Sequence, residues 1–134
     1  MSTLEVSNLN DGTTTVATTY ITNGSAKSWV NFNGSGTIAA RDSFNVSSFT
    51  DYASGQYAKN FTNNMNNADY SLAGQCSLDI TGSTPTNYTA LTVKQGSGYS
   101  TTSSCRVTTS YTTNTAGYAG DMEIVCLSIL GDLA

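Results

Sequence analysis

Short segments in which apolar and polar residues alternate run through most of the chain, and Gly- and Asn-rich turns separate them about every ten residues. The clearest segment spans residues 68–80 and places its large apolar side chains on one side: Tyr70, Leu72, Cys76, Leu78 and Ile80. Because successive side chains of a strand point to opposite faces, this alternation predicts a half-buried antiparallel strand. No stretch keeps a sustained helical period. We therefore predict an all-β fold, an antiparallel β-sandwich of jelly-roll-like form.

The N-terminal residues 1–25 differ from the rest of the chain, because turn signals at 10–12 and 23–25 interrupt them. They predict either an extended arm with one or two short strands, or an ordinary first strand of the sandwich. An arm this short has no core of its own, so its apolar side chains would gain stability on a neighbouring subunit; the candidates are Val6, Leu9 and Val16. Residues 26–134 are of single-domain size and are expected to form the sandwich.

The segment 27–46 contains the only Trp of the chain and predicts a hairpin. Val30 and Phe32 share one face of its first strand and Trp29 lies on the other, so both faces should be covered. The turn 33–36 (Asn-Gly-Ser-Gly) supplies the residues that a hairpin loop needs. The apolar residues expected in the core, here and in the segment 68–80, are Trp29, Val30, Phe32, Ile38, Phe44, Val46, Tyr70, Leu72, Leu78 and Ile80.

Three local features leave alternatives open. The pair Arg41-Asp42 interrupts the apolar side of the returning strand and indicates a β-bulge or a local ion pair. Gly74 indicates a bulge or a close approach of two backbones. The three cysteines all fall on apolar strand faces, which favours buried thiols, with a Cys76–Cys105 disulfide as the alternative. Their odd number and spacing indicate neither a disulfide framework nor a zinc site, and favour folding in a reducing cytoplasm.

The last predicted strand, residues 121–130, is apolar on both faces. Such a strand is either central in its sheet or pressed against another subunit. We accordingly take Val125, Leu127 and Ile129 as candidate residues of a subunit interface.

Composition argues against several classes of function. The chain contains no His, which removes the usual base of a catalytic triad and the commonest ligand of transition metals. Its net charge is −4 and its five Lys and Arg are scattered, which argues against nucleic acid. We expect neither a signal peptide nor a membrane anchor, because the first residues lack a basic region followed by an apolar core and no apolar stretch is long enough to span a bilayer. We predict no enzyme, no cofactor and no metal.

Some residues still allow contact or catalysis. Carboxylates at Asp69, Asp79, Asp121 and Glu123 could in principle serve glycoside hydrolysis, although acidic residues are expected on polar strand faces in any case. Tyrosines in predicted loops, Tyr52, Tyr99 and Tyr118, offer a surface for a receptor, because Tyr combines a large contact area with a polar tip. Scattered surface tyrosines are the simpler explanation.

The segment KSWVNFNGSGTIA (residues 27–39), followed by RDSFNVSS (residues 41–48), resembles a module of tail-fibre and other virion structural proteins of tailed bacteriophages, particularly marine and cyanobacterial phages. The similarity extends more loosely over residues 8–70. Ser28 stands where Ala is usual, and the turn 51–55 is bulkier than is typical. The resemblance implies a β-rich, commonly trimeric virion protein without cofactors or catalytic residues.

The resemblance suggests three roles. The first is a tail-fibre or tail-appendage subunit that docks to the virion, with host-surface glycan or protein as a further partner. The second is a head-decoration protein that stabilises the capsid, and the third, less favoured, is a phage-borne glycan hydrolase. In the first two the partners are further copies of the chain, expected as a homotrimer, and other tail or capsid proteins. Synthesis is expected in the cytoplasm of the host bacterium and residence in the virion.

Overall fold

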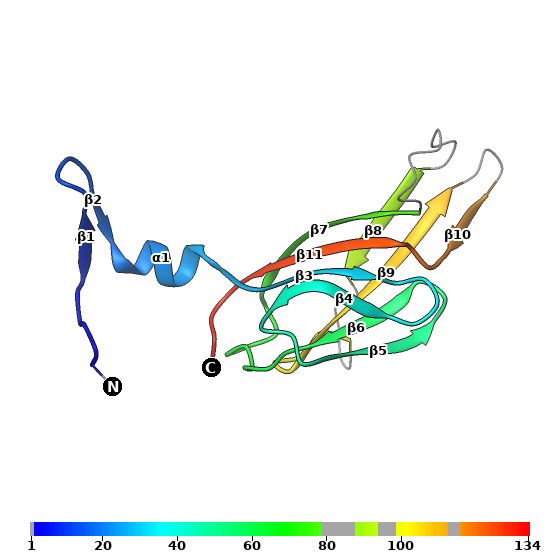
Figure 1. Ribbon diagram of the computed structural model, residues 1–134, viewed down its shortest axis with the longest axis horizontal. Coiled ribbons are helices and arrows are strands. Elements are labelled where there is room, and N and C mark those ends of the chain that lie inside the picture. The colour runs from blue at the N-terminus through cyan, green and yellow to red at the C-terminus, as the bar shows by residue number, and fades with distance from the viewer. Residues whose placement is uncertain (1, 79–87, 94–98, 113–115) are drawn as a thin grey trace.

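Two antiparallel sheets pack face to face in the computed structural model, which describes residues 2–78, 88–93, 99–112 and 116–134 (Figure 1). The first sheet has the strand order β4 (Ala39–Phe44), β3 (Ala26–Asn33), β11 (Ile124–Leu130) and β7 (Ser71–Ser77). The second has the order β10 (Gly117–Ala119), β9 (Ser104–Thr112), β6 (Gln56–Asn60) and β5 (Ser48–Ala53), and β8 (Tyr88–Val93) also pairs with β9. The predicted all-β sandwich is confirmed.

The core lies between the two sheets and is built from the inward side chains of β3, β6, β9 and β11. Phe32 is fully buried and packs edge-on against Tyr57, with ring centroids 5.5 Å apart. Predicted core residues that are buried here are Val30, Phe32 and Tyr70, and those packed at its margin are Ile38, Val46 and Leu72. The core prediction is therefore correct for these positions, and Ile80 lies outside the described residues.

Three predicted core residues are instead exposed: Trp29 at 38%, Phe44 at 51% and Leu78 at 37%. The register of β4 against β3 shifts at Arg41, so the predicted bulge is present there. The extra residue reverses the alternation, and Phe44 therefore pairs with Trp29 on the outer face of the sheet. Leu78 lies just beyond the end of β7, which is shorter than the predicted strand.

The last strand, β11, is central in its sheet and lies between β3 and β7. Its inward side chains Val125, Leu127 and Ile129 are buried against the second sheet, so the prediction that they form a subunit interface is wrong. The core of the same protomer buries all three side chains, so no second subunit is needed to cover them. Gly74 on β7 is paired without a bulge, but a Cβ there would lie 2.5 Å from the backbone oxygen of Cys126, which confirms the close approach of two backbones.

The N-terminal arm, which we define as residues 2–25, extends away from the sandwich (Figure 1). Its strands β1 (Asn8–Asn10) and β2 (Thr15–Ala17) pair only with each other among the described residues, so the alternative of a first sandwich strand is wrong. The Asp11 carboxylate accepts hydrogen bonds from the backbone N–H groups of Thr13 and Thr14, which closes the hairpin turn.

A short helix, α1 (Thr18–Gly24), forms the last part of the arm before β3 and was not predicted. Two turns are too few to show a helical period, and its Thr and Ile residues favour strands. Neither α1 nor the rest of the arm buries a large apolar side chain; those exposed are Leu4, Val6, Leu9, Val16, Tyr20 and Ile21.

Candidate functional site

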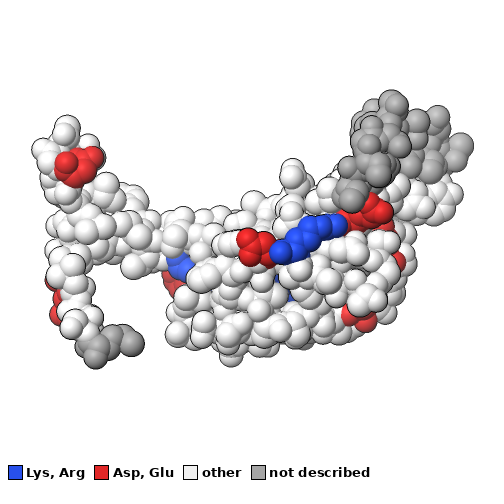
Figure 2. Space-filling model, viewed as in Figure 1, with Lys and Arg blue, Asp and Glu red and all other residues white. Residues whose placement is uncertain are grey.

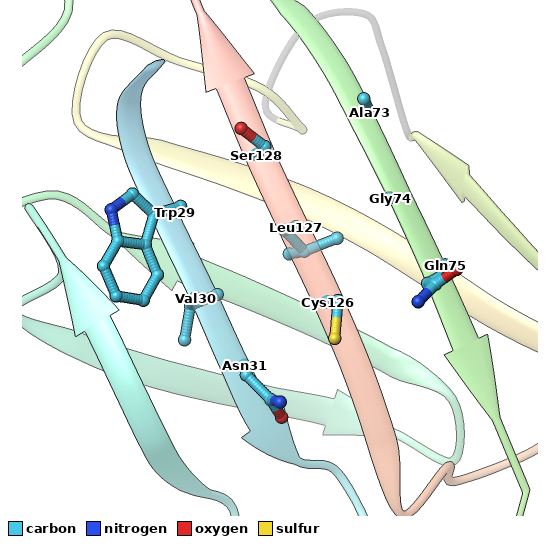
Figure 3. A pocket seen from close by; sticks show the side chains of 9 residues that line it. All are labelled: Trp29, Val30, Asn31, Ala73, Gly74, Gln75, Cys126, Leu127 and Ser128. Atoms are coloured by element: carbon cyan, nitrogen blue, oxygen red, sulfur yellow. The ribbon is translucent and has the colours of Figure 1, made fainter.

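An open groove crosses the outer face of the first sheet (Figure 3). It has a volume of about 490 Å³ and is lined by three neighbouring strands, β3, β11 and β7. The lining residues, which we call the Trp29 groove, are Trp29, Val30, Asn31, Ala73, Gly74, Gln75, Cys126, Leu127 and Ser128. Trp29 borders one side of the groove and Gln75 the other, with β11 between them (Figure 3).

The groove is a consequence of side-chain size at paired positions. Trp29 is paired with Ser128, which in turn is paired with Ala73 on β7. The neighbouring row pairs Cys126 with Gln75. The small side chains of Ser128, Ala73 and Cys126 leave a depression in the outer face of the sheet beside the large Trp29.

Hydrogen-bonding groups border the groove, and none of its lining residues is charged. Asn31 accepts a hydrogen bond through Oδ1 from Arg41 Nη1 at 3.1 Å, and Arg41 Nη2 donates to the backbone oxygen of Glu123 at 2.7 Å. Within the described part of the chain, no hydrogen bond engages the side chains of Gln75 or Ser128. The groove therefore combines an aromatic wall with neutral donors and acceptors.

The second sheet carries an aromatic cluster on its outer face. The Arg106 guanidinium lies 3.7 Å from the ring centroid of Tyr52 and 5.1 Å from that of Tyr99. It also donates from Nη2 to Gln56 Oε1 at 3.1 Å. Two of the three tyrosines proposed for receptor contact are thus brought together by Arg106, an arginine that sequence reasoning did not select.

The third tyrosine, Tyr118, lies apart from this cluster and packs on Tyr111, with ring centroids 5.7 Å apart. Tyr118 belongs to β10 and Tyr52 to β5, so neither lies in a loop as predicted. The side chains of Tyr52, Tyr99 and Tyr118 are all exposed to solvent. Exposure leaves them available for contact without showing that they make one.

The carboxylate of Asp121 has a structural task. It accepts hydrogen bonds from the backbone N–H of Gly55 at 2.7 Å and from the hydroxyl of Tyr57 at 2.8 Å. Burial, followed by the bond to Asp121, raises the pKa of Tyr57 well above its ordinary value. Asp79 lies outside the described residues. Across those residues, no group of three or more Cys, Asp or Glu side chains is arranged to hold a metal ion.

Lys59 is the most unusual ionisable group in the core. Its amine is buried and has no hydrogen-bond partner among the described residues, and it lies 5.5 Å from the centroid of the Phe61 ring. Burial lowers the pKa of Lys59 to about 8, and burial raises the pKa of the adjacent Cys105 thiol. The side chain is only 1% exposed, so no ligand reaches it. Tyr57, Lys59 and Phe61 occupy every second position of the sequence, and this pattern could have predicted that Lys59 lies on the buried face of its strand.

All three cysteines are free thiols, so the alternative Cys76–Cys105 disulfide is wrong. Cys105 is buried as predicted, whereas Cys76 and Cys126 are only partly buried. Cys76 packs at the margin of the core, and Cys126 faces outward into the Trp29 groove.

No protein-family model, curated protein or solved structure matches this chain. In the described ranges, no helix has the length and apolar character required to cross a bilayer. The structural features that bear on function are therefore the exposed arm and the outer faces of the two sheets.

Proposed function

We propose that the chain is a non-enzymatic structural protein of a bacteriophage virion, a tail-fibre or tail-appendage subunit that docks through its N-terminal arm. The observation that carries this proposal is the arm itself, which leaves the sandwich with its apolar side chains in solvent, Leu4 at 83% and Tyr20 at 75% exposure. The resemblance of residues 27–48 to tail-fibre modules supports the class of particle.

The arm has more apolar surface than it can bury alone. Complete burial of one Val, Leu or Ile side chain contributes about 1.5–3 kcal/mol. Val6, Leu9, Val16 and Ile21 keep 38–46% of their surface exposed in the protomer, so association with a partner would bury apolar surface that the arm cannot bury by itself. The proposed partners are other copies of the chain, as a homotrimer, and a neighbouring virion protein.

Contact with the host would fall to the sandwich. Tyr118 lies on β10, at the end of the molecule remote from the arm (Figure 1). Tyr52 and Tyr99 flank Arg106 on the outer face of the second sheet, where two aromatic rings and a guanidinium suit a sugar or a polar protein surface. A subunit with one end for docking and another for contact fits a tail appendage.

Head decoration is the second candidate, and the same arm favours it, because a protein that cements a capsid needs a segment that reaches across neighbouring capsomers. A glycan hydrolase has weaker support, since Asp121, one of the carboxylates considered for catalysis, is engaged by Gly55 and Tyr57. Release of reducing ends from host polysaccharide would revive it.

Antibody labelling of intact particles, viewed by electron microscopy, separates the candidates. We expect label at the tail. Label over the head would show that the protein decorates the capsid and is not a tail subunit. Absence of label from the whole particle would overturn the proposal. Antibody against a major capsid protein provides the control for accessibility.

A further inference from the structure

We propose that the Trp29 groove binds a neutral oligosaccharide, with a pyranose ring packed against the indole. The first observation is the placement of the Trp itself. Trp29 is 38% exposed on the outer sheet face, although its aromatic ring would stabilise the fold most if it were buried. The residues paired with it across the sheet, Ser128 and then Ala73, are small and leave a depression beside β3, and Figure 3 shows the indole at the β3 border of this depression, lying on the side of the strand away from β11.

The polar groups of the groove match hydroxyl groups. Arg41 holds Asn31 by its oxygen, which leaves the amide NH₂ as a donor in a fixed orientation. Gln75 supplies a second amide from the opposite border, and Ser128 supplies a hydroxyl between them. Amides both donate and accept hydrogen bonds, as sugar hydroxyls do, so each can engage a ring edge. A few placed polar groups on an otherwise apolar lining are typical of small-molecule sites.

Charge favours a neutral ligand. All residues that line the groove are uncharged, and the nearby cation of Arg41 is already committed to Asn31 and to the backbone of Glu123. The surface in Figure 2 is likewise largely uncharged, with acidic and basic side chains scattered over it. An anionic polymer would therefore find no cation free to receive it in the groove, whereas a neutral pyranose needs no counter-charge and can exchange its hydrogen bonds with water for bonds to the groove amides.

Size and shape agree with this ligand. The volume of about 490 Å³ lies within the range of roughly 300–1,000 Å³ that small-molecule sites occupy. The groove is open to solvent on the sheet surface, so it does not need to enclose the whole ligand. This inference depends on the proposed function in one respect: the proposed function places the oligosaccharide on the surface of the host.

The test uses Trp29 as its own reporter, because it is the only Trp in the chain. The full-length protein is titrated separately with cellohexaose, chitohexaose, maltohexaose and mannohexaose, and with an anionic alginate hexamer. We expect at least one neutral probe to shift Trp emission to the blue and to saturate, and the alginate probe to leave it unchanged. Calorimetry with Trp29→Ala should then show no binding.

A matched pair of glutamine variants checks the site. Gln75→Ala removes a groove amide and should weaken binding about fivefold, the equivalent of one hydrogen bond. Gln56→Ala removes an amide on the opposite sheet and should leave binding unchanged. Unchanged binding in Gln75→Ala would place the sugar elsewhere and overturn the proposal.

The other outcomes are equally decisive. No response to any neutral probe, or an equal response to alginate, would overturn the inference. A blue shift that grows with protein concentration in the absence of sugar would show that a second copy covers the groove, which also overturns it. Failure here leaves labelling of the particles unaffected, so the virion assignment is judged separately.

Discussion

Replacement of Lys59 by Met should stabilise the protein at neutral pH. The parent buries an amine that has no hydrogen-bond partner among the described residues, beside the Cys105 thiol and the Phe61 ring. Burial lowers the pKa of Lys59 from 10.5 to about 8. The difference between these pKa values corresponds to roughly 3 kcal/mol of unfolding free energy. Met keeps the length and apolar stem of Lys, and loss of the cation–π contact in this desolvated site offsets up to about 2 kcal/mol. We therefore expect a gain of about 1–3 kcal/mol at pH 7.

The gain should depend on pH in one direction. Because the pKa of Lys59 is lower in the folded protein, the unfolded chain binds the extra proton between about pH 8 and pH 10.5. The free energy of unfolding of the parent therefore rises with pH across this window relative to the variant, and the advantage of Lys59→Met shrinks. Tyr57 and Tyr70, whose pKa values are raised by burial, oppose this rise at high pH but are present in both proteins.

Urea denaturation of both proteins at pH 7 and pH 9.5, followed by Trp29 fluorescence, measures the difference. Lys27→Met is the matched control, because the Lys27 amine donates to the backbone oxygen of Ser25 at 2.8 Å and to its hydroxyl at 2.9 Å. The control should lose stability. A Lys59→Met protein that is no more stable than the parent at pH 7, or whose advantage is the same at both pH values, would refute the reasoning.

Three further predictions concern other parts of the molecule. Trp29→Ala should cost only about 1–2 kcal/mol in urea denaturation followed by circular dichroism, because the indole is half-exposed; a loss above about 3 kcal/mol would return it to the core. Gly74→Ala should cost about 1–3 kcal/mol, because a Cβ would lie 2.5 Å from a backbone oxygen of the next strand, whereas Gly24→Ala meets nothing within 4 Å and should change the midpoint little. Leu9→Asp combined with Val16→Asp should dissociate the proposed oligomer in sedimentation velocity at a concentration where the parent stays assembled; a monomeric parent would contradict arm-mediated assembly.

Local alternation was sufficient to predict most strands and the all-β class, because the period of a strand is two residues and appears in short segments. The prediction that both faces of the 27–46 hairpin are covered was wrong, since Trp29 and Phe44 are exposed on the outer face. The prediction failed where one extra residue interrupted the alternation along a strand. The bulge at Arg41 reversed the face of Phe44, although the bulge itself was one of two possibilities foreseen there. It also failed for α1, since fewer than three helical turns leave no periodic signal.

The candidate groove could not be predicted, because it depends on long-range pairing. Trp29 borders it only because β11 joins β3 to β7, which brings Ser128 and Gln75 from distant parts of the chain to one surface. The same pairing places Val125 in the core rather than at an interface. A doubly apolar strand indicated both possibilities, and the sequence alone contains no signal that decides between them.

The most direct test of the central proposal, that the chain is a bacteriophage virion protein, is a cryo-electron microscopy map of phage particles purified from the cells that produce this chain. We predict density for the sandwich on a tail appendage, with the arm, residues 2–25, packed through Val6, Leu9 and Val16 against neighbouring subunits. Particles whose tail and head both lack this density, or an arm that stays in solvent in the assembled virion, would contradict the account.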